Sequence, residues 1–600
     1  MELKKQDLQS RFDELSQILL GDMNPEGFWT GELSSSALGV AVAVAALHFH
    51  DPKAHHAEIQ KGLSWLQSNV NSDGSFGDTP ESPGNVSTSL LVYAATNLYA
   101  RSDDSTARLQ VKIAGYLASQ NIDVHSAQVA KVILNHYQKD YTFSVPILTL
   151  CGLCGVPGGE AFRHIPQLPF ELALLPGKFY RVLNLSVVSY AIPALIAVGI
   201  VVFKKKPSNA FGRLVRNWSI KPALALLHRL MPASGGFLEA IPLTAFVVLS
   251  LIEAGYRDLE VVEQGIQFLK KTQRADGSWP IDINLSTWVT TLAVKALRTK
   301  KDEVLTPEMK SRLTDHLRSI QNRQVHPFNR SAPGGWGWTN HSGSVPDGDD
   351  TPGAILALLQ LQPKEEVKGV VLAGCGWLLK LQNGDGGVPT FSKGWGKLPF
   401  DQSCADLTGH SLLAFSACLN AYHGEFSPVV FKAYRQAFLR MLNYLQKHQR
   451  QDGSWLPLWF GNQHTANHTN PVYGTAKVLT YLKDVLQHGW FDSNIRAKIG
   501  SLVESGERFL VGVQNADGSW GGGEAMPGTI EETALAISAL AGKQHCKICQ
   551  AGFGWLDKTY QQNGLQAAPI GLYFASLWYD EKLYPLTSYV EALARELECS

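Results

Sequence analysis

The sequence predicts an all-α fold in which pairs of helices repeat along the chain. Copies of one turn motif recur, and each copy lies between an amphipathic segment and an apolar helical segment. Repeated helix pairs build either a stacked array or a closed α-α ring. Because 600 residues exceed one ordinary core, we expect two large domains.

The turn motif combines Gln, Asp-Gly and an aromatic residue. Complete copies occupy residues 273–279, 449–455 and 514–520; residues 382–388 lack the Trp, and residues 71–76 are a weaker relative. The glycine permits a positive φ, the Gln amide can bond to helix-end groups, and the Trp ring can cover the next unit. A closed ring of such units would enclose a pocket. An open solenoid that binds peptides is the alternative, but it leaves the acidic cluster described below unexplained.

A long apolar stretch lies before the middle of the chain. Val182 to Phe203 carries no charge over 22 residues and is long enough to span a bilayer. Asn184 and Pro193 argue against a simple span, and an interior helix of a large α domain is also apolar all round. Ala223 to Met231 is a second, amphipathic candidate. Insertion into one leaflet is favoured over crossing of the bilayer.

Composition excludes several classes of function. Lys plus Arg equals Asp plus Glu, at 53 each, so the chain lacks the basic field that a nucleic-acid partner requires. Eight Cys in 600 residues do not form a disulfide scaffold. The pairs Cys151/Cys154 and Cys546/Cys549 have metal-like spacing, yet their apolar surroundings favour buried thiols. Residues 1–7 lack the apolar core of a signal peptide, which predicts a cytoplasmic protein.

Three carboxylates crowd into the four residues from Asp347 to Asp350. Neighbouring negative charges and burial both raise a carboxyl pKa, so at least one of the three could stay protonated near neutral pH. Thr351 as a cap and Pro352 at the first helical position predict a helix that begins there. A calcium loop is an alternative, but its sixth and twelfth positions, which need Gly and Glu, hold Pro352 and Leu358. Plain helix capping is the other alternative.

In these motifs the chain resembles the squalene-hopene cyclases, the bacterial class II triterpene cyclases. The resemblance rests on Asp347-Gly348-Asp349-Asp350-Thr351, on the repeated Gln…Asp-Gly-Ser-Trp turns and on Pro333-Gly334-Gly335, and it covers nearly the whole chain. It implies two α-α barrels of the α6-α6 toroid type with the active cavity between them. Residues 1–20 and 261–600 would form the catalytic barrel, and residues 20–260 an inserted second barrel.

The resemblance also assigns the acid machinery. Asp349 would be the general acid that protonates a terminal alkene, with Asp347 and Asp350 tuning it. His410 would be a positively charged partner that is hydrogen-bonded to Asp347. Asp406, four residues earlier on the same helical face, would orient His410.

The expected cavity lining is aromatic, because cation–π attraction stabilises a cation without trapping it as a nucleophile would. The resemblance places four rings there: Trp338, Trp288, Phe391 and Trp459. Tyr473 resembles the tyrosine that helps to reprotonate the acid through ordered water.

The chain also departs from the pattern of this family. At its C-terminal end Tyr579 is retained, but three non-aromatic residues stand where lining rings are expected: Ala568, Leu572 and Ser576. Val187 stands in place of an upstream tryptophan, and residues 34–44 lack the glutamate expected in the reprotonation network. These departures put a complete five-ring product in doubt.

The resemblance implies proton-initiated cyclisation of squalene or a similar linear polyprenoid to a polycyclic, hopene-like triterpene. The alternatives are a cyclase of a prenyl diphosphate or a prenylated aromatic compound, and a non-catalytic, lipid-binding α-α barrel. A diphosphate substrate would need a basic clamp at the cavity mouth. No metal or organic cofactor is required. The expected partners are the polyprenoid and the inner face of a membrane, to which the protein would attach as a peripheral or monotopic protein; a homodimer is left open.

Overall fold

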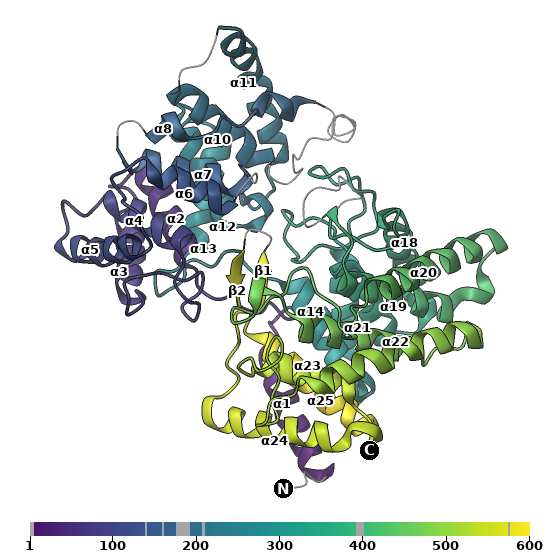
Figure 1. Ribbon diagram of the computed structural model, residues 1–600. Helices are drawn as coiled ribbons and strands as arrows, with labels where there is room; N and C mark the ends of the chain where they lie inside the picture. Colours follow the sequence, from purple (N-terminus) through teal and green to yellow (C-terminus); the bar gives the residue numbers. More distant parts are fainter. Residues whose placement is uncertain are drawn as a thin grey trace.

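The computed structural model describes residues 5–137, 141–158, 161–175, 192–206, 210–391, 401–573 and 576–599. Its helices form two lobes, and a short β-hairpin lies near their junction (Figure 1). The first lobe holds the purple and blue helices that follow the N-terminal helix, and the second holds the green and yellow ones. Helix α1 (Lys5–Gly21) packs in the second lobe, so both ends of the chain lie there.

In chain order, the helical elements of the first lobe are α2 (Ala37–His50), α3 (His56–Ser68), α4 (Val86–Asn97), α5 (Asp104–Ser119), α6 (Gln128–Tyr137), α7 (Tyr141–Leu153), α8 (Ala161–His164), η1 (Phe170–Leu174), α10 (Ile192–Lys205), α11 (Ala210–Leu230), η3 (Phe237–Glu239), α12 (Ile241–Glu253) and α13 (Glu260–Thr272).

Those of the second lobe after α1 are α14 (Ser286–Leu297), η4 (Arg298–Lys300), α15 (Lys301–Val304), α16 (Pro307–Ser319), α17 (Asp350–Leu361), α18 (Lys364–Leu381), α19 (Ala405–Tyr422), η6 (His423–Glu425), α20 (Pro428–His448), η7 (Ala466–His468), α21 (Pro471–Val485), α22 (Ser493–Gly512), α23 (Ile530–Leu540), η8 (Lys543–His545), α24 (Cys546–Asn563) and α25 (Leu583–Cys599). The hairpin strands are β1 (Gly571–Tyr573) and β2 (Leu577–Tyr579), which pair antiparallel.

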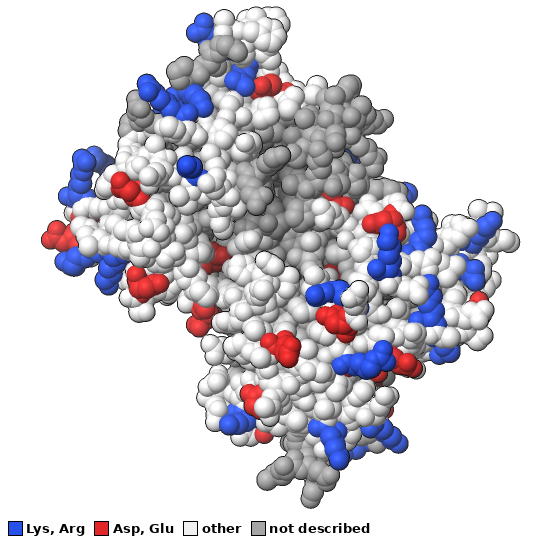
Figure 2. Space-filling model, in the orientation of Figure 1, with Lys and Arg blue, Asp and Glu red and all other residues white. Residues whose placement is uncertain are grey.

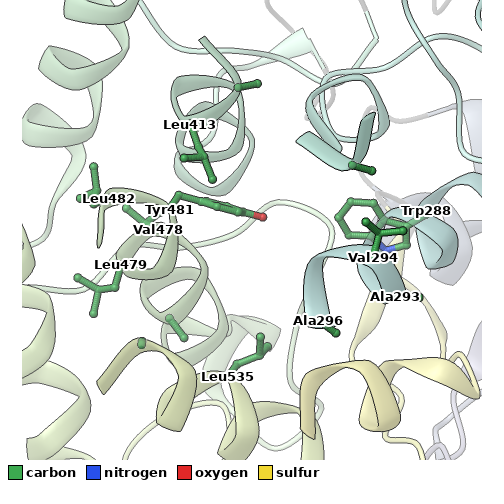
Figure 3. Packing of buried hydrophobic residues seen from close by; sticks show 14 of the residues in the cluster. Trp288, Ala293, Val294, Ala296, Leu413, Val478, Leu479, Tyr481, Leu482 and Leu535 are labelled. Carbon is green, nitrogen blue, oxygen red and sulfur yellow. The ribbon is translucent and has the colours of Figure 1, made fainter. Parts of the chain in front are cut away.

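The second lobe is a closed double ring. Its inner helices α14, α17, α19, α21, α23 and α25 each contact the next, and α25 contacts α14. Helices α16, α18, α20, α22, α24 and α1 form the outer layer. All residues of α23 are buried, whereas α20 buries one face, as expected for inner and outer positions. Figure 3 shows this interior, with Tyr481 of α21 pointing toward Trp288 of α14.

The first lobe closes in the same way. Helices α2, α4, α7, α10 and α12 each contact the next, and α12 contacts α2. The predicted all-α fold is therefore confirmed, and the closed ring rather than the open solenoid is the arrangement that forms.

Two buried hydrophobic clusters underlie the lobes. One extends from Ala37 to Trp279 and also includes Phe328 and Val345; the other combines residues 8–33 with most buried apolar residues of 281–597. Helix α13 packs with the first cluster, beyond the boundary expected at residue 260. The division into domains at residues 20 and 260 stays a prediction.

The Gln of each turn motif ties two helices together. The Gln273 amide donates to the carbonyl of Gly277 in its own turn at 3.1 Å and to that of Glu58 in α3 at 2.9 Å. Gln449 and Gln514 make the same pairs of bonds toward α22 and α24. The turn therefore fixes the spacing between neighbouring helix pairs.

The Trp of each motif contacts both its own helix and a neighbouring helix. The indole N–H of Trp279 donates to the Leu269 carbonyl at the end of its own helix, at 2.7 Å. The ring edge meets Gly62 of α3 so closely that a Cβ there would lie 3.2 Å from the ring. The prediction that the Trp covers a neighbouring unit is confirmed.

The apolar segments proposed to enter a membrane behave differently from the prediction. Among the described residues, no helix is both long and apolar enough to cross a bilayer. The described part of Val182–Phe203 is α10, which is buried from Pro193 onward against α7 and α12; residues 182–191 lie outside the described residues. Insertion of α10 into a leaflet is therefore wrong, because protein covers its apolar surface. In Ala223–Met231 the apolar face also packs inward, and the exposed apolar side chains of α11 lie earlier, between Phe211 and Trp218.

The buried-thiol prediction is confirmed for Cys151, Cys154 and Cys549, whereas Cys546 is half-buried. Burial raises the pKa of Cys151 to about 12, so this thiol is unreactive. Within the part of the chain that the structure describes, no group of three or more His, Cys, Asp or Glu is placed to hold a metal ion.

Candidate active site

The acid loop, residues 347–350, directly follows another copy of the turn motif. The sequence did not reveal this copy because its Gln and its Gly lie far apart. The Gln321 amide donates to the carbonyls of Gly334 at 2.9 Å and Val370 of α18 at 3.0 Å. The Trp336 indole donates to the Leu317 carbonyl at 2.7 Å. The Gln and Trp of the other turn motifs make the same hydrogen bonds, but here a longer loop separates the Gln from its Gly. Sequence analysis therefore missed this copy, although the pair Gly334-Gly335 before Trp336 was visible.

Thr351 belongs to this repeat and not to a helix cap. Its hydroxyl accepts the backbone N–H of Trp336 at 3.0 Å, just as Thr475 accepts that of Trp455 at 2.9 Å. The predicted cap at Thr351 is wrong, because its oxygen is already engaged by the preceding turn.

Asp347 caps α17 instead. Its Oδ1 accepts the N–H of Asp349 at 2.9 Å and that of Asp350 at 2.7 Å, so the helix begins at Asp350 rather than at Pro352. A Cβ at Gly348 would lie 2.4 Å from a neighbouring carbonyl, so only glycine allows this approach. The loop therefore holds three carboxyls at the mouth of α17, as the sequence predicted.

All three carboxyls line a large, mainly apolar cavity between the lobes. Its volume is about 250 Å³, and α7, α10 and α12 of the first lobe line it together with α14 and several loops of the second. The Asp349 side chain is 20% exposed, whereas Asp347 and Asp350 are buried. Asp349 is therefore the most accessible of the three carboxyls.

His410 bonds to Asp349 and not to Asp347 as predicted. Its Nδ1 lies 2.7 Å from Asp349 Oδ1, and its ring stacks on Tyr481 with centroids 4.7 Å apart. Asp347 Oδ1 is occupied by the backbone N–H groups of α17, which leaves Asp349 as the partner within reach.

The predicted positive charge on His410 is also disfavoured. Burial lowers the pKa of His410, and Lys477 and Lys295 lower it further, while the hydrogen bond to Asp349 opposes them. At neutral pH the structure favours a neutral ring. With the proton on Nδ1, His410 donates to Asp349 Oδ1.

Asp406 lies one helical turn before His410, but among the described residues no hydrogen bond joins the two. Its Oδ1 is buried without a partner. Burial, and then the charge of Asp349, raises the pKa of Asp406 to about 6. The predicted orienting role of Asp406 is therefore not seen, and Tyr481 holds the ring instead.

The acid cluster retains protons. Burial raises the pKa of Asp347 to about 7, although the backbone N–H groups it accepts oppose this effect. Burial and the negative charge of Asp347 raise the pKa of Asp350 well above its usual range. At least one proton therefore stays on the cluster near neutral pH, as expected from three crowded carboxyls.

Two lysines near the acid, the buried Lys477 and the half-buried Lys295, escaped sequence analysis. The Lys477 ammonium lies 5.5 Å from the ring centre of Trp288, and Lys295 bonds to both oxygens of Glu591 at 2.8 Å. Burial lowers the pKa of both, that of Lys295 to about 8. A charged residue inside an otherwise apolar inner helix was the signal that could have revealed them.

Tyr473 lines a second, smaller cavity with Lys477, Glu531 and Glu591. Its volume of about 20 Å³ is enough for one water molecule. Phe460 stacks on Tyr473 with ring centres 4.1 Å apart and lines both cavities. The role of Tyr473 in a water relay stays a prediction.

The four predicted lining rings all reach the large cavity: Trp288, Trp338, Phe391 and Trp459. Three contacts make an edge-to-face row, with centroid distances of 5.9 Å for Trp338–Phe391, 6.1 Å for Phe391–Trp459 and 5.9 Å for Trp459–Tyr573. Such rings present negative faces to a cation.

Near the C-terminus, two of the residues that line the cavity lie one position after the predicted ones. Tyr573, Leu577 and the predicted Tyr579 line the cavity, and Leu572 does not. Adjacent side chains of a strand point to opposite faces, so Leu572 lies against Gly461 instead. Tyr573 thus supplies a ring that the sequence comparison did not assign.

Ala568 and Ser576 are also not among the described lining residues. Ser576 occupies the exposed turn of the hairpin with a φ of 55°. Ala568 packs against the core and donates its N–H to Glu531 at 2.8 Å. Val187, the other predicted departure, lies outside the described residues.

Two α-α rings with an acid-lined apolar cavity between them define a protein suited to hold an apolar chain against a proton donor. Residues 13–111 match the squalene-hopene cyclase N-terminal domain, and residues 284–570 match the squalene-hopene cyclase C-terminal domain. The chain therefore belongs to the squalene-hopene cyclase family of class II terpene cyclases.

Individual relatives are distant. The chain is 24% identical over 590 residues to squalene hopane cyclase afumA of Aspergillus fumigatus, covering 82% of this chain and 75% of that protein. It is 24% identical over 665 residues to enfumafungin synthase efuA of Hormonema carpetanum, covering 96% of this chain but only 47% of that protein. The solved structure of ent-copalyl diphosphate synthase from Streptomyces platensis has the same fold, with a TM-score of 0.54, 16% identity and coverage of 98% and 99%.

Proposed function

We propose that this protein cyclises a long, uncharged polyprenoid such as squalene by protonating its terminal alkene. One observation carries the proposal: Asp349, hydrogen-bonded to His410, opens into an apolar, ring-lined cavity. Proton transfer from Asp349 would leave a carbocation on the substrate and a carboxylate on the protein. The successive alkenes of the folded chain would then attack in turn.

The surroundings of Asp349 support its role as the donor. Protonation of an alkene needs a strong acid, so the conjugate base must be stabilised. After the transfer, the His410 Nδ1–H would donate to the Asp349 carboxylate, and the cations of Lys477 and Lys295 lie near the same site. Asp347, with Asp350, would tune the acid by holding the loop and sharing protons.

The cavity favours an uncharged substrate over a prenyl diphosphate. Among its described lining residues there is no Lys or Arg, and most of the surface is aliphatic or aromatic. A diphosphate would bring at least two negative charges beside the acid cluster without a counter-ion. This observation favours squalene-like substrates over the alternative that needs a basic clamp.

The test is product formation by the purified protein. Incubation with squalene is expected to give cyclic hydrocarbons or alcohols detectable by mass spectrometry, while geranylgeranyl diphosphate gives none. Asp349→Asn is expected to lose at least about 10²-fold in rate with an unchanged circular dichroism spectrum, since the amide cannot supply the proton. Cyclic product formed by Asp349→Asn at the wild-type rate would refute the acid assignment.

We also propose that the first half of α11 contacts a lipid surface. Its exposed apolar residues follow one helical face: Phe211, Leu214, Val215 and Trp218. Basic side chains belong to the same helix and to the end of α10, and Figure 2 shows Lys and Arg around this end of the molecule, at the top of the view. Helices α7, α10 and α12, which line the cavity, belong to the same lobe, so a hydrocarbon could enter from the bilayer.

Vesicle sedimentation tests this surface. The double variant Phe211→Ser/Trp218→Ser is expected to lose most binding to phosphatidylglycerol-containing vesicles, because two large exposed side chains no longer insert. Val429→Ser is the matched control, since Val429 is equally exposed at 78% but lies on α20 of the other lobe. Equal sedimentation of both variants would remove α11 as the contact.

A further inference from the structure

A second acidic side chain, Asp282, faces the large cavity outside the acid loop. It is 5% exposed and lines the cavity directly. The backbone around it is held in place: the N–H of Ile241 donates to the Ile281 carbonyl at 3.1 Å, and that of Ile283 donates to the Glu239 carbonyl at 3.2 Å. Asp282 is therefore a rigid part of the wall.

The polar atoms at this point of the wall are incompletely satisfied. Asp282 Oδ1 accepts the N–H of Ile283 at 2.9 Å, and among the described residues no hydrogen bond reaches its second oxygen. The Trp338 indole N–H lies near enough to affect the carboxyl but has no full hydrogen-bond partner. Because an unpaired buried donor is costly, this indole N–H beside a carboxyl of the cavity wall indicates a polar atom of a ligand.

The chemistry of the site restricts that atom to an uncharged one. Burial, and then the charge of Glu239, raises the pKa of Asp282 well above its usual range, so its carboxyl is neutral and can donate an O–H. The neighbouring lining residues Leu238, Ala240 and Leu243 are apolar. A neutral acid and an indole N–H suit a hydroxyl or carbonyl oxygen and not an anion.

We propose that Asp282 and Trp338 form a subsite for one uncharged oxygen, a hydroxyl or carbonyl group carried by the polyprenoid substrate. The inference rests on the proposed function and narrows its substrate class. Asp282 pairs with Ala240 on the first-lobe side of the cavity, whereas Asp349 immediately precedes α17 of the second lobe. The oxygen would therefore lie at the Asp282 end of the substrate, and the alkene to be protonated at the Asp349 end.

Binding can be measured apart from catalysis in full-length Asp349→Asn protein. Quenching of tryptophan fluorescence would give the Kd of squalene and of a squalene alcohol with one terminal hydroxyl. The alcohol is expected to bind roughly tenfold more tightly, the effect of one or two hydrogen bonds. Adding Asp282→Leu should abolish this preference, while Asp282→Asn, which keeps an acceptor and a donor, should retain part of it.

Equal binding of the two compounds to Asp349→Asn protein would overturn the subsite, and so would a preference that Asp282→Leu leaves unchanged. If Asp282→Leu fails to fold, Trp338→Phe removes the indole N–H while keeping an aromatic ring, and it should lower the preference several-fold; no change in the preference would overturn the proposal. Failure of the proposed function would show separately, as absence of cyclic product from either compound with wild-type protein. The binding preference does not depend on turnover.

Discussion

The contact between His410 and Asp349 is the feature on which the proposed proton transfer most depends. The hydrogen bond of 2.7 Å and the parallel stacking on Tyr481 fix the imidazole before the reaction, so little reorganisation is needed when Asp349 becomes a carboxylate. A neutral ring suffices for this, because its Nδ1–H stabilises the product of the transfer more than the reactant.

His410→Phe tests this contribution, since the substitution keeps a ring against Tyr481 but removes Nδ1. We expect kcat to fall by about 10²–10⁴, with KM within about threefold, because the lost interaction strengthens only as charge develops. Steady-state kinetics with squalene would measure both constants. His423→Gln is the control, an exposed histidine at the end of the same helix; if kcat of His410→Phe matches this control, the assignment fails.

The turn motifs owe their sequence to close contact between neighbouring helices. Gly518 has a φ of 92°, and a Cβ there would lie 2.5 Å from the Ala551 carbonyl of α24. Conformation and space therefore both require glycine at this point of the turn. The same two conditions recur at Gly277 and Gly453, which explains why Asp-Gly is the most regular part of the motif.

Gly518→Ala should consequently lower the free energy of unfolding by more than the 1–2 kcal/mol that a left-handed residue costs, about 2–4 kcal/mol in all. Gly500→Ala is a matched control in α22, where an added Cβ meets no atom within 4 Å. There alanine should be neutral or stabilise by up to about 1 kcal/mol, because it favours the helix. Urea unfolding of the two variants would decide, and equal midpoints would contradict this account of the turns.

Buried acids influence the stability of the whole molecule. Burial raises the pKa of Asp347 to about 7 and that of Glu531 to about 8, from ordinary values near 4. In this range the folded protein holds protons that the unfolded chain has lost, so raising the pH destabilises the fold. Histidines such as His316, whose pKa burial lowers to about 4, act in the opposite direction, but only below about pH 6.5.

The melting temperature should therefore fall between pH 6.5 and pH 8. Each proton retained by the folded state adds a slope of roughly 1.4 kcal/mol per pH unit. Differential scanning calorimetry at constant ionic strength would measure the change, and Glu531→Gln should make the slope shallower. A melting temperature that is constant or rises over this interval would show that these carboxyls ionise freely in the folded state.

Sequence analysis succeeded where a short segment carries its own signal. The alternation of amphipathic and apolar segments around each turn motif predicted repeated helix pairs, because the period of apolar residues follows directly from which sides of a helix are covered. The crowding of Asp347 to Asp350 likewise predicted retained protons, since adjacent carboxyls repel wherever they lie.

Contacts between distant segments were decided only by the tertiary structure. The partner of His410 depended on Asp347 being occupied by the start of α17, and Tyr573 replaced Leu572 in the wall because the hairpin register sets which strand face meets the cavity. Lys477 and Asp282 lie at interior surfaces only because the two helical rings close, so the sequence did not single them out. Sequence by itself determined the helices, the turns and the acidic loop, because these rest on local periodicity and charge. The cavity and the neighbours of each acid arise from packing between residues hundreds of positions apart.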